Sequence, residues 1–184
     1  MNLITPKMRG VRPTMDIARE SLMNLIGPID SEACVLDLFG GTGAVGIEFL
    51  SRGAGQLTIG ELKRVNCEMI KQNVQKAHYE DRTRIIHGSF ERTLTLLREE
   101  CERFDYVFID PPYATDYSEK ALSILIKCGI LNKGAQIIVE RESKDVRPLD
   151  TQGLELVKDR TYGTARFLFY QVEESHESHL SGQL

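Results

Sequence analysis

Residues 104–113, with the sequence FDYVFIDPPY, form an apolar segment that ends in a carboxylate, two prolines and an aromatic ring. Prolines cannot continue a β-ladder, so the expected strand ends there in a stiff loop. In this loop Asp110 and the Pro111 carbonyl can accept the two hydrogens of an exocyclic amine, and Tyr113 can stack on its base. We therefore expect that Asp110, Pro111, Pro112 and Tyr113 hold an amine whose nitrogen accepts a methyl group. Such a transfer requires no strong general base if the methyl donor is a cationic sulfonium, because the proton can leave after the transfer.

A second group of residues suited to chemistry lies earlier, in the segment DLFGGTG that starts at Asp37. Its glycines allow the backbone to approach a ligand closely at a strand-to-helix turn. The spacing of Gly41, Gly43 and Gly46 matches the GxGxxG pattern of dinucleotide sites. Glu61 follows about twenty residues on, where its carboxylate can bind both hydroxyls of a ribose. These residues alone fit a nicotinamide cofactor and S-adenosylmethionine equally well.

Asp37 distinguishes between these two cofactors. A carboxylate beside the turn is unfavourable for a pyrophosphate, which prefers helix amides and no negative charge. The same carboxylate suits the ammonium and the sulfonium of S-adenosylmethionine, either directly or through water. The sequence therefore favours S-adenosylmethionine as the cofactor.

These residues need a scaffold, and short apolar segments alternate with helical ones along the chain. An amphipathic helix is expected before Gly27, because Leu22 and Ile26 continue an apolar pattern at helical spacing. Strands are expected at residues 33–37, 56–61, 83–87, 106–110 and 135–140, with helices at 44–52, 63–78, 91–100 and 118–128. This alternation predicts an α/β fold, in which a parallel sheet is covered by helices on both faces.

The C-terminal part of the chain follows a different pattern. Residues 154–159 and 165–172 have strand character without a helix between them, which predicts an antiparallel hairpin at the sheet edge. No Pro- or Ser-rich linker divides the chain, so we expect one domain over residues 1–172. Within it, residues 1–13 form a short basic arm, and residues 173–184 form a polar tail that is expected to be disordered.

The overall composition is that of an ordinary globular domain. The 184 residues carry 23 Lys and Arg against 27 Asp and Glu, and 41% of them are hydrophobic. No run reaches the roughly 18 apolar residues of a membrane span, and the N-terminus lacks a signal peptide, so we expect a soluble cytoplasmic protein. The four cysteines are spread along the chain without metal-ligand spacing, and no metal site is expected.

The net charge of −4 is distributed unevenly along the chain. Three glutamates after residue 172 supply much of it, whereas the N-terminal segment is basic. The whole-chain acidity therefore does not argue against a nucleic-acid partner. We expect contacts with phosphates from Lys7, Arg9, Arg12 and Arg19.

Taken together, these motifs resemble the bacterial 16S ribosomal RNA guanine-N2 methyltransferases of the RsmD family. The resemblance covers about residues 12–170 and rests on RPTMDIARESLMNLI, LDLFGGTGAVGIEFLSRGA, Glu61, Asn73, DPPY, Glu140 and YGTARFLFY. It implies a seven-stranded Rossmann-like methyltransferase domain, S-adenosylmethionine as donor, and methylation of a guanine in 16S ribosomal RNA, in an assembled or assembling small subunit. By position, the cofactor would be lined by Asp37, Phe39, Gly41, Gly43, Glu61, Ser89 and Phe90, and residues 110–113 would hold the guanine.

The chain departs from the family at Ser89, where the family often has an acid. A hydroxyl can still accept a hydrogen bond from the adenine amine, although the loss of a charged acceptor costs about 1 kcal/mol of cofactor affinity.

Three other functions fit parts of the sequence. A DNA adenine-N6 methyltransferase shares DPPY but commonly has extra mass for target recognition. A nicotinamide oxidoreductase leaves Asp37 and DPPY without a role, and a noncatalytic RNA-binding module does not need Asp110.

Overall fold

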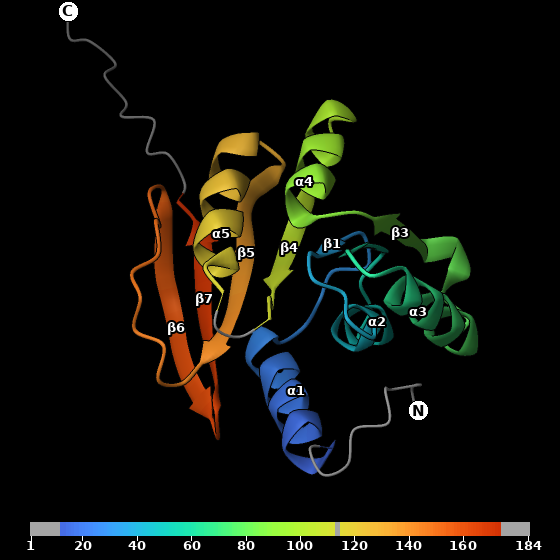
Figure 1. Cartoon of the computed structure of the whole chain (residues 1–184), viewed down its shortest axis with the longest axis horizontal. Coiled ribbons are helices and arrows are strands. Elements are labelled where there is room, and N and C mark those ends of the chain that lie inside the picture. Colours follow the sequence, from blue (N-terminus) through green and yellow to red (C-terminus); the bar gives the residue numbers. More distant parts are fainter. Residues whose placement is uncertain (1–11, 113–114, 174–184) are drawn as a thin grey trace, which may run out of the picture.

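The structure of the chain, a computed structural model, describes residues 12–112 and 115–173, with side chains from residue 19 onward. Helices and strands alternate along most of it (Figure 1). The helices are α1 (Arg12–Ile26), α2 (Ala44–Ser51), α3 (Arg64–Lys76), α4 (Phe90–Glu99) and α5 (Tyr117–Cys128), and a short 3-10 turn, η1 (Glu80–Arg82), precedes the third strand. The strands are β1 (Cys34–Asp37), β2 (Gln56–Glu61), β3 (Thr83–His87), β4 (Phe104–Ile109), β5 (Leu131–Glu142), β6 (Leu154–Tyr162) and β7 (Ala165–Val172).

All seven of these strands form one sheet in the order β3-β2-β1-β4-β5-β7-β6. The first five strands in this order, from β3 to β5, run parallel to one another, whereas β7 pairs antiparallel with both β5 and β6. The strand order reverses between β1 and β4, and ligands bind outside the carboxyl ends of the strands at such a switch point. The predicted fold class is confirmed, and the topology places the glycine turn and Asp110 with its two prolines after neighbouring strands.

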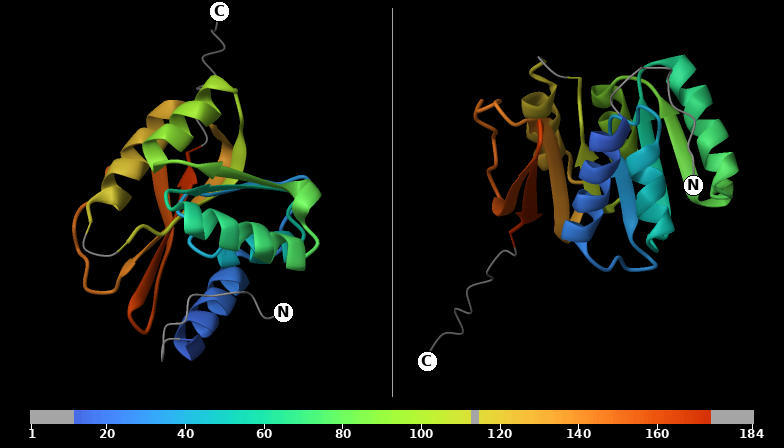
Figure 2. Two further views of the ribbon diagram at one scale, coloured as in Figure 1. Left: turned by 45° about the vertical axis from the view of Figure 1, so that its right-hand side comes forward. Right: turned by 90° about the horizontal axis from the view of Figure 1, so that it is seen from below.

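Two layers of helices enclose the sheet, as the two views of Figure 2 show. Strand residues alternate between the two faces. Val107 and Ile109 belong to the apolar core beneath α4 and α5, whereas Phe108 belongs to the core on the side of α1, α2 and α3. Burial of both faces explains why the parallel strands have almost continuous apolar sequences.

Strand β5 is longer than the sequence predicted, since it starts at Leu131 rather than at residue 135. The sequence prediction did not include residues 131–134 in the strand. In the structure Gly134 has a φ of 71°, and the pairing of β5 with β4 shifts register between Phe104 and Tyr106. A glycine therefore absorbs an irregularity within the strand instead of ending it. Strand β6 likewise extends to Tyr162, beyond the predicted end at residue 159.

Among the described residues, no helix is both long and apolar enough to cross a membrane. The predicted basic arm was given as residues 1–13, but residues 12 and 13 begin α1, and the rest of the arm lies outside the described residues. Of the predicted tail, residues 173–184, only Glu173 is described, and its amide donates to the Gly153 carbonyl (3.1 Å).

Candidate active site

The glycine turn connects β1 to α2 and is held by backbone hydrogen bonds. The Gly40 amide donates to the carbonyl of Gly60 on β2 (2.8 Å), and the Gly43 amide donates to the Gly40 carbonyl (2.6 Å). A Cβ at Gly40 would lie 2.3 Å from Cγ2 of Ile59, so the turn packs too closely on β2 for a side chain. Gly43 has a φ of 76°, which L residues rarely adopt. The backbone can therefore lie directly under a ligand.

Asp37 ends β1 beside this turn and is only 2% exposed. Its Oδ2 accepts a hydrogen bond from the Gly46 amide (3.3 Å), whereas Oδ1 is buried without a hydrogen-bond partner. Burial raises the pKa of Asp37 to about 7, with a smaller rise from the charge of Glu61, although the backbone amides of Gly46 and Phe39 act in the opposite direction. A buried carboxylate oxygen without a donor is costly, and a cationic ligand would satisfy it.

Glu61 ends β2 opposite the turn, and both of its oxygens accept backbone hydrogen bonds. Oε2 accepts from the Gly41 amide (2.9 Å) and Oε1 from the Lys63 amide (2.7 Å). Each carboxylate oxygen can accept a second hydrogen bond, so hydroxyls of a ribose can still bind. The amides thus orient the carboxylate before any ligand arrives. The residues present fit an adenosine-type cofactor with a cationic group near Asp37.

Three aromatic rings lie in contact next to this site. The Phe90 ring centroid is 5.4 Å from that of Phe39, and also 5.4 Å from that of Tyr117. Phe39 follows β1, Phe90 begins α4, and Tyr117 begins α5. The sequence predicted contacts from the first two, but it gave no signal for Tyr117, which is joined to them only by the fold.

Ser89 is the N-cap of α4, and its Oγ accepts a hydrogen bond from the Arg92 amide (3.4 Å). The preceding residue, Gly88, donates its amide to the Glu61 carbonyl (3.0 Å), so this loop is fixed to the end of β2. A capping hydroxyl keeps a second lone pair for a ligand. Ser89 therefore has a structural role, and its hydroxyl can still accept the hydrogen bond from adenine that the sequence predicts.

Asp110 directly follows β4, and β4 is the neighbour of β1, the strand that ends at Asp37. Burial raises the pKa of Asp110 well above its ordinary value, and the negative charges of Glu140 and Asp37 raise it further. These carboxylates lie two residues beyond Phe108, Ile138 and Val35, which all face the core under α1. Because side chains alternate in strands, the structure places the three acids on the same face at neighbouring strand ends.

The segment that contains the two prolines, residues 110–113, which we call the proline loop, is described only in part. Pro111 is buried and Pro112 is exposed, while Tyr113 lies outside the described residues. Glu140 was recognised in the sequence only as part of the family resemblance. Its position near Asp110 gives it an electrostatic effect that no spacing in the sequence could indicate, since thirty residues separate them.

The structure describes the predicted basic residues unevenly. Lys7 and Arg9 lie outside the described residues, and only the backbone of Arg12 is described, at the start of α1. Arg19 is half-buried on the same helix. Figure 2 (right) shows the first turn of α1 at the edge of the sheet where the turn between β1 and α2 lies. The N-terminal end of this helix therefore faces the same side of the molecule as the site.

Comparisons with known proteins agree with this architecture. The family model described as conserved hypothetical protein 95 matches residues 1–171. The chain is 33% identical to the ribosomal RNA small subunit methyltransferase D of Haemophilus influenzae, over 88% of this chain and 83% of that protein. A solved structure of a candidate methyltransferase from Escherichia coli has a TM-score of 0.78 and 30% identity, covering 93% of this chain and 91% of that chain. A tRNA (guanine(26)-N(2))-dimethyltransferase from Thermoplasma volcanium is 32% identical over 50% of this chain and 25% of that protein.

Proposed function

The chain belongs to the conserved hypothetical protein 95 family, the RsmD family, and from this premise we propose that it methylates the exocyclic amine of a guanine in small-subunit ribosomal RNA. The observation that carries the proposal is the placement of Asp37 and Asp110. The first lies buried beside the glycine turn with an unpaired oxygen, and the second opens the proline loop on the adjacent strand. A cationic donor and an amine acceptor would thus meet at the switch point of the sheet.

S-adenosylmethionine, when bound, supplies a methyl group on a cationic sulfonium. Asp37 balances the positive charge of the cofactor, and Glu61 binds the ribose hydroxyls. Phe39, Gly41 and Gly43 form the surface under the cofactor, while Ser89 and Phe90 contact the adenine. These residues lie at the carboxyl ends of β1 and β2, in the turns that follow β1 and β3, or at the start of α4, and the contacts given above hold these turns in place.

At the target, Asp110 and the Pro111 carbonyl accept hydrogen bonds from the guanine amine and orient its nitrogen toward the methyl group. Pro112 keeps the loop rigid, and Tyr113 stacks on the base. As the nitrogen gains the methyl group it becomes cationic, and it then loses one proton. Burial, and then the neighbouring charges of Glu140 and Asp37, raise the pKa of Asp110, so its carboxylate is a stronger base than an isolated one and is suited to accept that proton.

The RNA is held by phosphate contacts from the N-terminal basic residues Lys7, Arg9, Arg12 and Arg19. The position of the first turn of α1 on the side of the site supports this assignment (Figure 2). A guanine in the small-subunit RNA is favoured because of the names of the relatives and because the loop chemistry suits an exocyclic amine. Double alanine substitution of Arg9 and Arg12 is expected to flatten the salt dependence of RNA binding.

The test is transfer of labelled methyl groups from S-adenosylmethionine to three acceptors: small ribosomal subunits lacking the modification, naked 16S RNA, and duplex DNA. We expect label in ribosomal RNA, and N2-methylguanine after nuclease digestion. Label in N6-methyladenine of the DNA, or none in RNA with folded protein that binds the cofactor, would rule out the proposal. Mapping N2-methylguanine in cells with and without the gene then identifies the nucleotide.

A further inference from the structure

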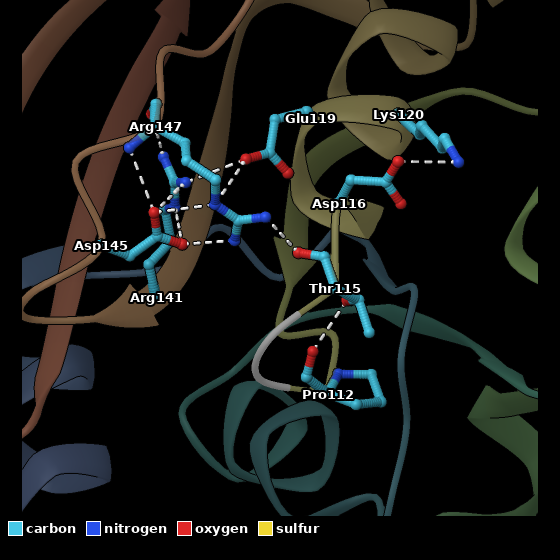
Figure 3. A network of polar contacts seen from close by, with 8 residues as sticks. All are labelled: Pro112, Thr115, Asp116, Glu119, Lys120, Arg141, Asp145 and Arg147. Carbon is cyan, nitrogen blue, oxygen red and sulfur yellow. Dashed lines mark hydrogen bonds and ion pairs between the residues drawn. The ribbon is translucent and has the colours of Figure 1, made fainter.

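Four charged side chains form a compact network between the end of β5 and the start of α5. We call Glu119, Arg141, Asp145 and Arg147 the arginine network; Figure 3 shows it beside the segment that follows the two prolines. Two positive and two negative charges balance within it. None of these residues was singled out by the sequence, and none has a role in the chemistry described above.

Arg141 lies at the centre of the network, and its side chain is only 3% exposed. Its Nη2 lies 3.0 Å from Oε1 of Glu119 and 2.7 Å from Oδ1 of Asp145. Its Nη1 donates to the backbone carbonyl of Arg147 (2.6 Å). A buried guanidinium therefore fixes the backbone on which Arg147 stands, as well as the acid that Arg147 contacts.

Arg147 connects the arginine network to the proline loop. Its guanidinium pairs with both oxygens of Asp145, and its Nε lies 3.2 Å from Oε1 of Glu119. The remaining nitrogen, Nη1, donates to the backbone carbonyl of Thr115 (2.6 Å). The Thr115 hydroxyl in turn donates to the carbonyl of Pro112 (2.8 Å). A continuous series of short contacts thus connects β5 to the second proline (Figure 3).

We propose, on the basis of the proposed function, that Arg147 is a positioning residue for methyl transfer. Through the Thr115 carbonyl it fixes the Pro112 carbonyl, and with it the loop that presents Asp110 to the target amine. In this role Arg147 acts through Thr115, while Glu119, Arg141 and Asp145 hold its guanidinium in one orientation.

The exposure of Arg147 distinguishes this role from a purely stabilising one. The side chain is 43% exposed, and exposed ion pairs contribute little to stability because water screens them. A small displacement of a positioned group, in contrast, can lower a rate by about 100-fold. Loss of Arg147 should therefore reduce the rate of the chemical step far more than it reduces the melting temperature.

The experiment compares Arg147→Ala with Arg84→Ala as a matched control. Arg84 also forms a two-pronged pair with a carboxylate, that of Glu100, and its side chain is 41% exposed, but it lies on β3 away from the loop. We expect Arg147→Ala to lower kcat by about 10- to 100-fold, with an unchanged KM for S-adenosylmethionine and a melting temperature close to that of the control. Arg147→Lys keeps a donor without the fork and should restore part of kcat.

A second pair of variants tests the contact nearest the prolines. Thr115→Val removes the hydroxyl that binds the Pro112 carbonyl but keeps the backbone carbonyl that Arg147 contacts, whereas Thr115→Ser keeps both. We expect a lower kcat only for Thr115→Val. Wild-type kcat in both Arg147→Ala and Thr115→Val, or a loss confined to the cofactor KM or to the melting temperature, would overturn the assignment.

Hydrogen exchange separates failure of this inference from failure of the proposed function. Amide exchange in the segment from Asp110 to Glu119 should accelerate in Arg147→Ala and remain at the wild-type rate in Arg84→Ala. If the wild-type chain methylates no ribosomal RNA but exchange still accelerates, the loop is positioned as argued and the function is wrong. If the wild type is active and exchange does not change, the positioning role is wrong.

Discussion

The two halves of the site are held in place by different means. The cofactor half, from β1 to β3, is fixed by hydrogen bonds between backbone groups, as when the Gly40 amide donates to the Gly60 carbonyl and the Gly88 amide donates to the Glu61 carbonyl. The target half, at β4 and β5, is fixed by side chains, as when Arg147 donates to the carbonyl of Thr115 from 32 residues away. Backbone contacts tolerate changes of side chain except where space is lacking, whereas a side-chain contact disappears with a single substitution.

This difference predicts that substitutions in one half leave the other half functional. The cofactor half should bind S-adenosylmethionine even when the target half is inactive. Substitutions in the target half should lower the rate of methyl transfer without changing the affinity for the cofactor. The following substitutions test this separation, beginning with the largest expected effect.

Asp110→Ala removes the group that orients the amine and accepts its proton. We expect kcat to fall by about 100- to 1000-fold, comparable to the loss of one preorganised polar group in other enzymes. Calorimetry should show an unchanged cofactor affinity, because the hydrogen bonds that hold Asp37, Glu61 and the glycine turn do not involve Asp110. Asp110→Asn keeps the shape and one acceptor, and should retain more activity. Cofactor affinity that falls in parallel with kcat would show that the two halves are not separate.

Asp37→Asn should change binding and stability in opposite directions. The pKa of Asp37 is raised to about 7 in the folded chain, so the folded state binds its proton more tightly than the unfolded state does. Wild-type stability therefore falls as pH rises from about 4 to about 7 and is level above that range. The variant should lose this slope and melt at a higher temperature than wild type at pH 8, while cofactor affinity falls by about 10-fold or more.

Melting curves and calorimetry at pH 5 and pH 8 check both effects of Asp37→Asn. Asp159→Asn is the matched control, because the pKa of the Asp159 carboxyl is shifted in the opposite direction: Arg166 lowers it. Its stabilising effect is already present at both pH values, so the control should be less stable than wild type at each. A pH slope that persists in Asp37→Asn would mean that another group causes it.

Gly40→Ala tests whether close packing fixes the cofactor half. The added Cβ would lie 2.3 Å from Ile59 Cγ2 and 3.3 Å from the Gly60 carbonyl, so β2 and the turn must separate. We expect a loss of roughly 1 to 3 kcal/mol in unfolding free energy, together with weaker cofactor binding. Gly129→Ala is the control, because Gly129 has a φ of 69° with open space around it, and only backbone strain of about 1 kcal/mol is expected. Equal losses in unfolding free energy, measured by urea titration, would contradict the packing argument.

The same contrast explains what the sequence could predict. The glycine turn, the carboxylate of Glu61 and the Asp110-Pro111-Pro112 segment are local patterns, and each lies at the strand end where it was expected. The arginine network and the contact of Tyr117 with Phe90 join residues that come together only after the sheet forms. No period or spacing encodes such contacts. Strand β5 was predicted too short for a related reason, since the effect of Gly134 depends on its pairing with β4.

Ser89→Asp has the smallest expected effect and tests the boundary of the cofactor half. Aspartate is as good an N-cap as serine, and its charge interacts favourably with the start of α4, so the bond from the Arg92 amide is kept. A charged acceptor should also bind the adenine amine more strongly, which corresponds to cofactor affinity up to about fivefold tighter for about 1 kcal/mol. Ser89→Ala removes the cap and should instead lower stability by about 1 kcal/mol. Because Ser89 lies entirely in the cofactor half, kcat at saturating cofactor should stay at the wild-type value in Ser89→Asp; a changed kcat would place this residue in contact with the target as well.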